Sequence, residues 1–175
     1  MEMKEFYYQN RIRVSVFNLD HEAVPYHFHN EVSDMVYCSR GQIAIELPEA
    51  GEVFTVLPGQ VFQVPRTNKH RFVNGAPVGT PSRYVLLQLG TFDINFVPAA
   101  EGLAGKVADR IATHVADADV YIQNRKADVL ELADRFASEK PEDLTAEEQT
   151  DVVRALRCFV DCGIEAEHPR AAVQP

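Results

Sequence analysis

The sequence predicts a mainly β fold, a small barrel or sandwich of short strands, followed by a C-terminal α-helical extension. Residues 11–90 are rich in Val, Ile, Phe and Tyr and are divided by turn-forming Gly and Pro. Residues 101–168 lose this punctuation and gain Ala, Glu, Asp and Leu. The 175 residues, 46% of them hydrophobic, suffice for one core and an appendage. We therefore expect a β-barrel over residues 1–98 and a helical extension over residues 99–175, which packs on the barrel, on a dimer partner or on both.

The strands of the barrel are indicated by alternation and by turns. Apolar residues at 12, 14 and 16 alternate with Arg13 and Ser15, a period of two that is typical of a half-buried strand. Turn sequences such as Pro58-Gly59 separate the later strands. The expected strands cover residues 11–18, 25–29, 34–39, 41–47, 52–57, 60–65, 70–74 and 83–90.

Two helices are expected in the first half of the extension. A spacing of four residues places apolar side chains on one helical face. The first helix is indicated by Leu103, Val107, Ile111 and Val115, and the second by Val129, Leu132 and Phe136. Because the residue before a proline avoids helical geometry, the second helix should end at Lys140-Pro141.

A third helix should begin at Thr145, since Thr145 and Glu148 have the spacing of a capping box. Gly163 stands where a C-terminal helix cap is expected. The apolar stripe of this helix consists of Val152, Val153, Leu156, Phe159 and Val160.

Charge and cysteine content exclude several classes of protein. The net charge is −9, with 17 basic residues against 26 acidic ones and no basic run, which argues against nucleic acid as a partner. Three cysteines do not form a disulfide framework. The N-terminus has no apolar signal region and no stretch approaches the length of a membrane span, so we expect a cytoplasmic protein without a membrane partner.

A histidine-rich stretch carries the most informative chemistry. His27 and His29 are two residues apart on a predicted strand, so both side chains leave the same face. Asp34 opens the next predicted strand, and His70 lies on a later one. Imidazole and carboxylate together suit Fe, Mn, Ni, Cu or Zn as divalent ions. A site of this kind leaves coordination positions open for water or substrate.

These residues and their spacing resemble the two motifs of the cupin superfamily. The first motif there is His-x-His, then a carboxylate, then a glycine after six residues; the second is a glycine, a Pro-Gly turn, a later His and an Asn four residues on. This chain matches them with His27, His29, Asp34 and Gly41, and then with Gly51, Pro58-Gly59, His70 and Asn74. The resemblance implies a double-stranded β-helix, or jelly-roll barrel, in which His27, His29, Asp34 and His70 bind one metal ion.

The chain departs from the cupin pattern at two places. Asp34 replaces the usual Glu, and the glycine that normally precedes the first histidine is absent. Glu31 is therefore an alternative to Asp34 as the fourth ligand, if the chain stays extended after His29.

Further residues are candidates for the pocket around this site. Cys38 shares the face of Asp34 by alternation and either lines the pocket or packs as a small hydrophobe. Asn74 is either a turn residue or a site residue. Tyr26 and Gln63 are the other candidates, and alternation alone does not decide the faces of Tyr37, Arg83 and Gln88.

Two functional hypotheses follow from the resemblance. In the first, the chain is a metal-binding cupin that binds or transforms a small polar metabolite, with dioxygenase, isomerase and lyase chemistry all open. In the second, it is similar to the N-terminal sensor and dimerisation domain of AraC-type regulators and lacks their DNA-binding half. Both hypotheses include a small-molecule ligand and a homodimer.

Overall fold

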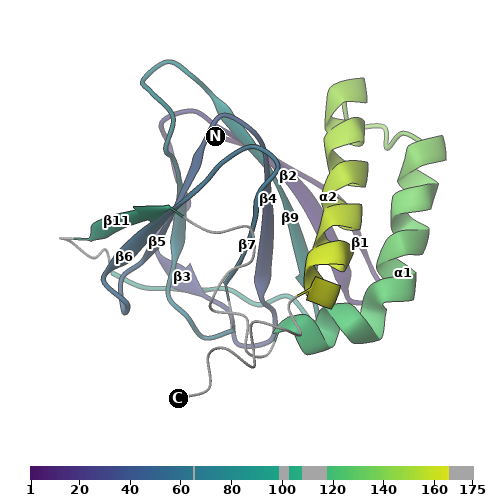
Figure 1. Cartoon of the computed structure of the whole chain (residues 1–175), viewed down its shortest axis with the longest axis horizontal. Helices are drawn as coiled ribbons and strands as arrows, with labels where there is room; N and C mark the ends of the chain where they lie inside the picture. Colours follow the sequence, from purple (N-terminus) through teal and green to yellow (C-terminus); the bar gives the residue numbers. More distant parts are fainter. Residues whose placement is uncertain (65, 99–102, 108–117, 166–175) are drawn as a thin grey trace.

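The computed structural model describes residues 1–64, 66–98, 103–107 and 118–165 (Figure 1). Its strands and helices follow the predicted change from β to α along the chain. They are β1 (Glu2–Gln9), β2 (Ile12–Leu19), β3 (His27–Phe28), β4 (Asp34–Arg40), β5 (Ile43–Leu47), β6 (Glu52–Val56), β7 (Val61–Val64), β8 (Arg71–Asn74), β9 (Ser82–Leu89), β10 (Asn95–Phe96), β11 (Ala104–Val107), α1 (Ala118–Ser138) and α2 (Ala146–Glu165).

The strands form two larger sheets that face each other and a separate short pair. The five-stranded sheet has the order β1-β2-β9-β4-β7, the four-stranded sheet the order β11-β6-β5-β8, and β10 pairs with β3. The described strand pairs are antiparallel except for β11 and β6, which are parallel. Figure 1 shows the facing sheets and the two helices beside them. The predicted jelly-roll barrel with C-terminal helices is confirmed.

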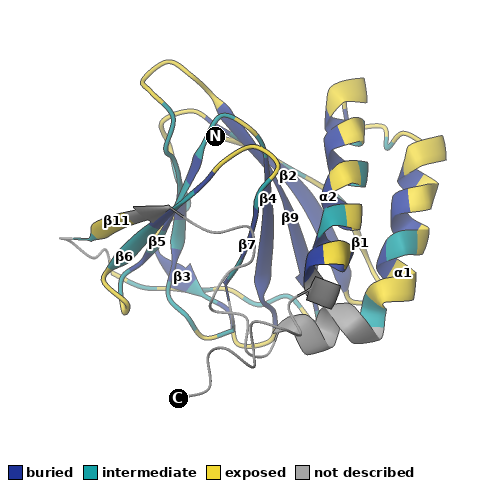
Figure 2. Cartoon of the chain, viewed as in Figure 1, coloured by how far each residue is buried: buried dark blue, intermediate teal, exposed yellow. Residues whose placement is uncertain are grey.

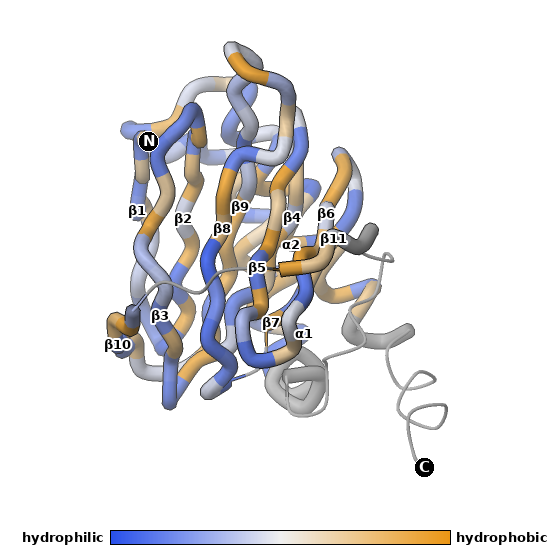
Figure 3. Tube along the Cα trace, turned by 90° about the vertical axis from the view of Figure 1, so that its left-hand side faces the viewer, coloured by the Kyte–Doolittle hydropathy of each residue, from blue (hydrophilic) through white to orange (hydrophobic). Residues whose placement is uncertain are grey.

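The inside of the barrel is an apolar core between the two sheets. Strands β2 and β4 to β9 contribute to it the residues on one face of the pleat. Figure 3 views the molecule from the side of the four-stranded sheet and shows hydrophobic and hydrophilic residues interspersed along its strands. The buried residues of this inner core are Phe17, Leu19, Val36, Cys38, Ile43, Ile45, Leu47, Phe54, Val56, Phe62, Val64, Phe72, Tyr84 and Leu86.

A second core lies between the five-stranded sheet and the helices. Figure 2 shows that α1 and α2 bury the sides that face this sheet and expose the opposite sides. Residues at 12, 14 and 16 of β2 and at 85, 87 and 89 of β9 belong to one core with α2 residues such as Leu156 and Phe159. The interpretation of residues 11–18 as a half-buried strand is therefore wrong, because Arg13 and Ser15 on the other face are buried as well.

The predicted N-terminal cap of α2 is formed. The Thr145 N–H donates to Glu148 Oε2 at 2.9 Å, and the Glu148 N–H donates to Thr145 Oγ1 at 3.2 Å. Glu148 also accepts a hydrogen bond from Lys4 of β1 at 2.9 Å. This carboxylate therefore caps the helix and fastens it to the edge of the sheet.

The structure corrects the prediction at several elements. Residues 104–107 form β11 rather than a helix, and Ile111 and Val115 lie outside the described residues. Helix α2 continues to Glu165, so Gly163 is not its C-terminal cap. Strands β1 and β10 were not expected from the sequence. None of the helices that the structure describes is long and apolar enough to span a bilayer.

Candidate metal centre

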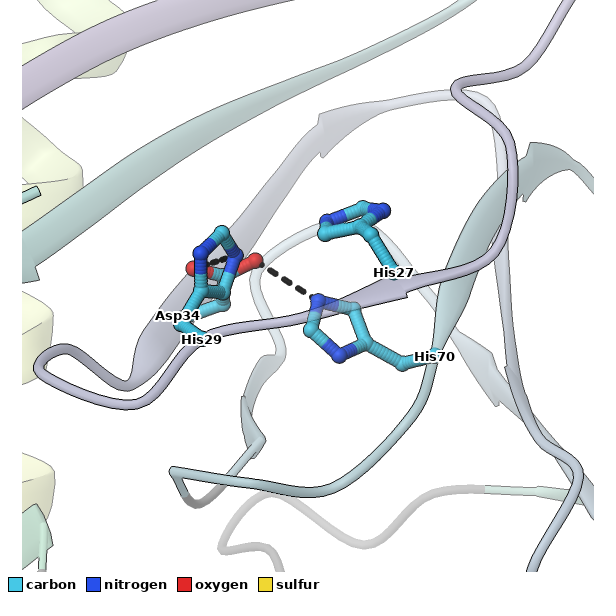
Figure 4. Close-up of side chains that lie close together, drawn as sticks. All are labelled: His27, His29, Asp34 and His70. Carbon is cyan, nitrogen blue, oxygen red and sulfur yellow. Dashed lines mark hydrogen bonds and ion pairs between the residues drawn. The ribbon is translucent and has the colours of Figure 1, made fainter. Parts of the chain in front are cut away.

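Four polar residues meet beside β3, where a bridge ties the short β3–β10 pair to the residue before β8 (Figure 4). His27 lies on β3, His29 follows it, and Asp34 is the first residue of β4. His70 immediately precedes β8, and an antiparallel bridge pairs it with His27. In that bridge the His27 N–H donates to the His70 carbonyl at 3.1 Å, and the His70 N–H donates to the His27 carbonyl at 2.9 Å. Backbone pairing thus brings the two predicted motifs together.

The side chains of these residues converge on one point. One nitrogen or carboxylate oxygen from each of His27, His29, Asp34 and His70 lies within 4.8 Å of the others. His70 Nε2 is 2.9 Å from Asp34 Oδ2, and His29 Nε2 is 3.3 Å from Asp34 Oδ1. All four side chains are at most 4% exposed. The arrangement is a buried polar cluster that borders the apolar core of the barrel.

Each of the three imidazole rings is held at Nδ1, on the side away from the cluster centre, by a main-chain carbonyl. His27 Nδ1 donates to the Pro25 carbonyl at 2.8 Å, His70 Nδ1 to the Asn68 carbonyl at 2.8 Å, and His29 Nδ1 to the Asp93 carbonyl. A ring that donates from Nδ1 presents an unprotonated Nε2 when it is neutral. Carbonyl partners of this kind are the usual outer support of metal-binding histidines.

Electrostatics within the cluster favour an ionised carboxylate and an uncharged His27. Burial alone would raise the pKa of the Asp34 carboxyl, but the neighbouring His29 and His70 hold it well below its usual range. Burial, together with the charge of His70, lowers the pKa of His27 to about 4. Burial also opposes protonation of His29, but the nearby Asp34 charge outweighs it and raises the pKa of that ring. At neutral pH Asp34 and His27 are thus in the forms that bind a cation.

The cluster fits a divalent transition-metal ion. Metal–nitrogen and metal–oxygen bonds of about 2.0–2.2 Å place ligand atoms up to about 4.4 Å apart. The four donor atoms lie within 4.8 Å of one another, which is close to the spacing that one ion requires. The buried His29 Nε2 makes no hydrogen bond within the described part of the chain, although it lies close to Asp34. A buried ring nitrogen without a hydrogen bond is costly, and an ion coordinated at that nitrogen would remove the cost. His27, His29, Asp34 and His70 are the residues that would hold the ion.

The segment after β9 surrounds the cluster and was not recognised from the sequence. The Asp93 carboxylate accepts the main-chain N–H groups of Asn30 at 2.8 Å and Glu31 at 2.9 Å, which fixes the loop after His29. The ring of Phe92 lies 5.8 Å from that of His29, and the ring of Phe96 lies 6.2 Å from that of His27. Phe96 is 61% exposed although its ring packs beside a buried histidine. The β10–β3 pairing and the hydrogen bonds of Asp93 bring this segment to the site.

The alternative ligand and two pocket candidates lie elsewhere. Glu31 is exposed, with only its main chain tied to Asp93, and the cluster does not include it. Tyr26 points away from the neighbouring His27 and donates to Glu46, while the Arg71 guanidinium lies 4.4 Å over its ring. Asn74 bonds the main chain of Asp20 and Thr80, both at 2.8 Å, which is the role of a turn residue.

The other two pocket candidates also lie away from the cluster. Cys38 points into the barrel as alternation predicted, but it packs in the inner core as a small hydrophobe. Gln63 pairs across the sheet with Met35, whose side chain belongs to the core beneath the helices. Gln63 therefore faces away from the inside of the barrel. Gln88 is different, because its amide donates a hydrogen bond to Asp34.

Comparisons with known proteins give similarity in structure only. No protein-family model matches the chain, and a search of curated proteins found no match. The polyketide cyclase RemF from Streptomyces resistomycificus is 23% identical, with 57% of this chain and 72% of that chain covered and a TM-score of 0.48. A protein with a double-stranded β-helix domain from Klebsiella pneumoniae is 17% identical, with 56% and 86% covered and a TM-score of 0.49.

A third similar structure is the DMSP lyase DddQ from Ruegeria pomeroyi, which is 15% identical. The match covers 53% of this chain and 47% of that one, with a TM-score of 0.44. None of these similarities transfers an activity. The strand order, the two motifs joined at β3 and the buried cluster of three histidines and an aspartate are this chain's own features, and by them it has the cupin fold.

Proposed function

We propose that this chain is a metal-binding cupin that binds or transforms a small polar metabolite at the barrel end where the two motifs meet. The proposal rests on one observation: three imidazoles, each tied at Nδ1 to a carbonyl, point Nε2 toward the same carboxylate. A hydrogen-bonded core histidine needs no such convergence. The expected ion is one of Fe, Mn, Ni, Cu or Zn in the divalent state.

Each residue of the cluster has a definable task. His27, His29 and His70 supply neutral nitrogen, and Asp34 supplies the negative charge that offsets part of the charge of the ion. A bound ion would polarise a carboxylate, carbonyl or enediol of the metabolite, or activate dioxygen. Asp93 and the main-chain carbonyls keep the histidines in place. Phe92 and Phe96 supply apolar surface beside two of the rings.

Dioxygenase, isomerase and lyase activities all remain within this proposal, as does binding without turnover. The structures named above include no AraC-type regulator, so the sensor alternative gains no support. We also propose a homodimer, and a division of the chain into a barrel over residues 1–98 and an extension over residues 99–175, of which β11 adds a strand to the four-stranded sheet. The packing of α1 and α2 on the five-stranded sheet supports the extension as a covering layer.

The first experiment is elemental analysis by inductively coupled plasma mass spectrometry on protein purified without a histidine tag. We expect about one equivalent of a transition metal in the wild type and almost none in His27→Ala. His21→Ala is the matched control, because His21 is exposed and outside the cluster, and it should keep the metal. Metal retained in His27→Ala at the wild-type level, or no metal in the wild type after reconstitution, would contradict the proposal.

The identity of the metal then selects the assays. Iron would direct the search to dioxygen uptake with small organic acids. Manganese, nickel or zinc would direct it to isomerase and lyase screens. Thermal stabilisation by a metabolite without turnover would indicate a binding protein.

A further inference from the structure

A row of polar side chains crosses three strands on the inner face of the five-stranded sheet. Arg13 of β2 pairs with Gln88 of β9. The pairing of Met35 with Leu87 places Asp34 of β4 beside Gln88 on the other side. All three side chains are buried. The next rows into the barrel are largely apolar and include Leu86, Val36, Phe17, Tyr84 and Cys38.

Hydrogen bonds connect this row from the cluster to the surface. Gln88 Nε2 donates to Asp34 Oδ1. Arg13 Nη1 donates to Gln88 Oε1 at 2.6 Å, and Arg13 Nε donates to Glu5 Oε2 at 2.7 Å. The Arg13 guanidinium also lies 4.1 Å over the ring of Phe92. Glu5 on the edge strand β1 is partly exposed and balances the buried charge of Arg13.

The chemistry of the row leaves the Gln88 amide one orientation. A guanidinium can only donate hydrogen bonds, so the group that faces Arg13 must be the amide oxygen. The amide nitrogen must then face Asp34, where it meets an ionised carboxylate that can only accept. Rotating the amide would set its N–H groups against the donors of Arg13 and its oxygen against the carboxylate of Asp34. Arg13 thus fixes the orientation of the Gln88 amide, and with it the hydrogen bond that Asp34 accepts, without contacting Asp34.

The Asp34 carboxylate is consequently held at Oδ1, while Oδ2 faces His70. Gln88 holds Oδ1, and His70 Nε2 lies 2.9 Å from Oδ2. A short aspartate in place of the glutamate found in related motifs has less reach, so its rotation must be limited for it to face the histidines. We propose that Gln88 is the positioning residue of the metal site, and that Arg13 acts on the site only through Gln88. This inference rests on the metal site proposed above.

Cobalt(II) titration of the purified, metal-free protein tests this inference. The dissociation constant is measured by competition with a chelator, and the absorption spectrum of bound cobalt reports its ligand arrangement. Gln88→Leu removes the donor at similar volume and should weaken binding about 10–100-fold, as expected for the loss of an outer partner of a ligand. The cobalt spectrum should shift as well, which a simple loss of fold stability would not cause.

Arg13→Lys keeps the charge but loses the guanidinium that bonds both Glu5 and Gln88. Cobalt binding should therefore weaken, by a smaller factor than in Gln88→Leu. Arg83→Lys is the matched control. Arg83, on β9, is buried like Arg13, but it pairs with Asn18 and Asp151 rather than with the row that leads to the cluster. It should leave both the dissociation constant and the spectrum unchanged.

The double variant Arg13→Lys with Gln88→Leu gives the sharpest result. If Arg13 acts only through Gln88, the double variant should bind cobalt as weakly as Gln88→Leu alone. The inference would be overturned if the double variant weakened cobalt binding by the product of the two single factors. It would also be overturned if Gln88→Leu kept the wild-type affinity and spectrum. In both cases the metal site itself stands. Absence of cobalt binding in the wild type, or full binding in His27→Ala, would overturn both the site and the inference.

Discussion

The main chains of His27 and His70 exchange two hydrogen bonds, of 3.1 and 2.9 Å, across a single antiparallel bridge. The rings of the two residues stand 4.4 Å apart. Their spacing is therefore set by the barrel backbone and does not depend on a bound ion. A site prepared in this way loses little conformational entropy when an ion binds.

Asp34 rather than Glu31 should complete the site. Asp34→Ala should lower the affinity for cobalt or zinc by at least about 10-fold, because it removes the carboxylate nearest to His29 and His70. Glu31→Ala should change the affinity by less than about twofold, since the Glu31 side chain is exposed and only its main chain is held. Isothermal titration calorimetry of both variants decides the matter, and the reverse order would make Glu31 the ligand.

Metal binding should stabilise the folded chain. An ion present at about 100 times its dissociation constant raises the free energy of unfolding by about 2.7 kcal/mol. For a chain of this size that corresponds to a rise in Tm of about 5–10 °C. Differential scanning calorimetry should show this rise in the wild type and its reversal by EDTA. His70→Ala should show neither change, and an equal rise in that variant would mean that the ion binds elsewhere.

Glu148 should make the stability of the chain sensitive to acid. Burial alone would raise its pKa, but the Thr145 N–H, Lys4 and Asn18 outweigh it and lower the pKa to about 2. Since the unfolded value is 4.5, the contribution of Glu148 is complete above pH 4.5 and is lost as the pH falls through 2. It amounts to at most about 3 kcal/mol.

The variant Glu148→Gln isolates this effect, because glutamine keeps the capping box and removes the charge. Urea unfolding at pH 7 should show the variant less stable than the wild type, with the difference shrinking toward pH 3. A difference that does not depend on pH would show that the charge of Glu148 is not responsible.

The covering layer of helices should depend on the centre of α2. Leu156 is fully buried against the five-stranded sheet, so Leu156→Ala should lower the free energy of unfolding by about 2–5 kcal/mol. Its exposed neighbour Arg157 pairs with Asp134 at the surface, and Arg157→Ala should cost no more than about 1 kcal/mol. Urea denaturation followed by circular dichroism compares them, and equal losses would place Leu156 outside the core.

The strands and the cluster could be predicted from the sequence because each depends on local spacing. The period of two marks the buried strands, and His27, His29, Asp34 and His70 are marked by residue type and by distance along the chain. Strand β1 gave no such signal, because it is an edge strand whose residues, Met3 among them, are mostly exposed. Residues 103–107 had helical spacing, but pairing with β6 made most of them a strand.

The surroundings of the cluster could not be predicted because they depend on register between strands. Tyr26 and Gln63 looked like pocket residues, and the fold turns both away from the cluster. Gln88 was one of several residues of undecided face, and Arg13 looked like the solvent side of a half-buried strand. Only the pairing of β2 with β9 and of β9 with β4 aligns Arg13 and Gln88 with Asp34.

Strand β9 is buried along its whole length, with alternate residues in two different environments. Leu87 packs beneath the helices, whereas Gln88 faces Asp34 inside the barrel. Inserting or deleting a single codon upstream in this strand would exchange the two, which puts an amide into the core beneath the helices and a leucine next to the carboxylate. A point substitution in β9 therefore changes only one of the two environments. A change in the length of the strand changes both at once, so both environments constrain that length.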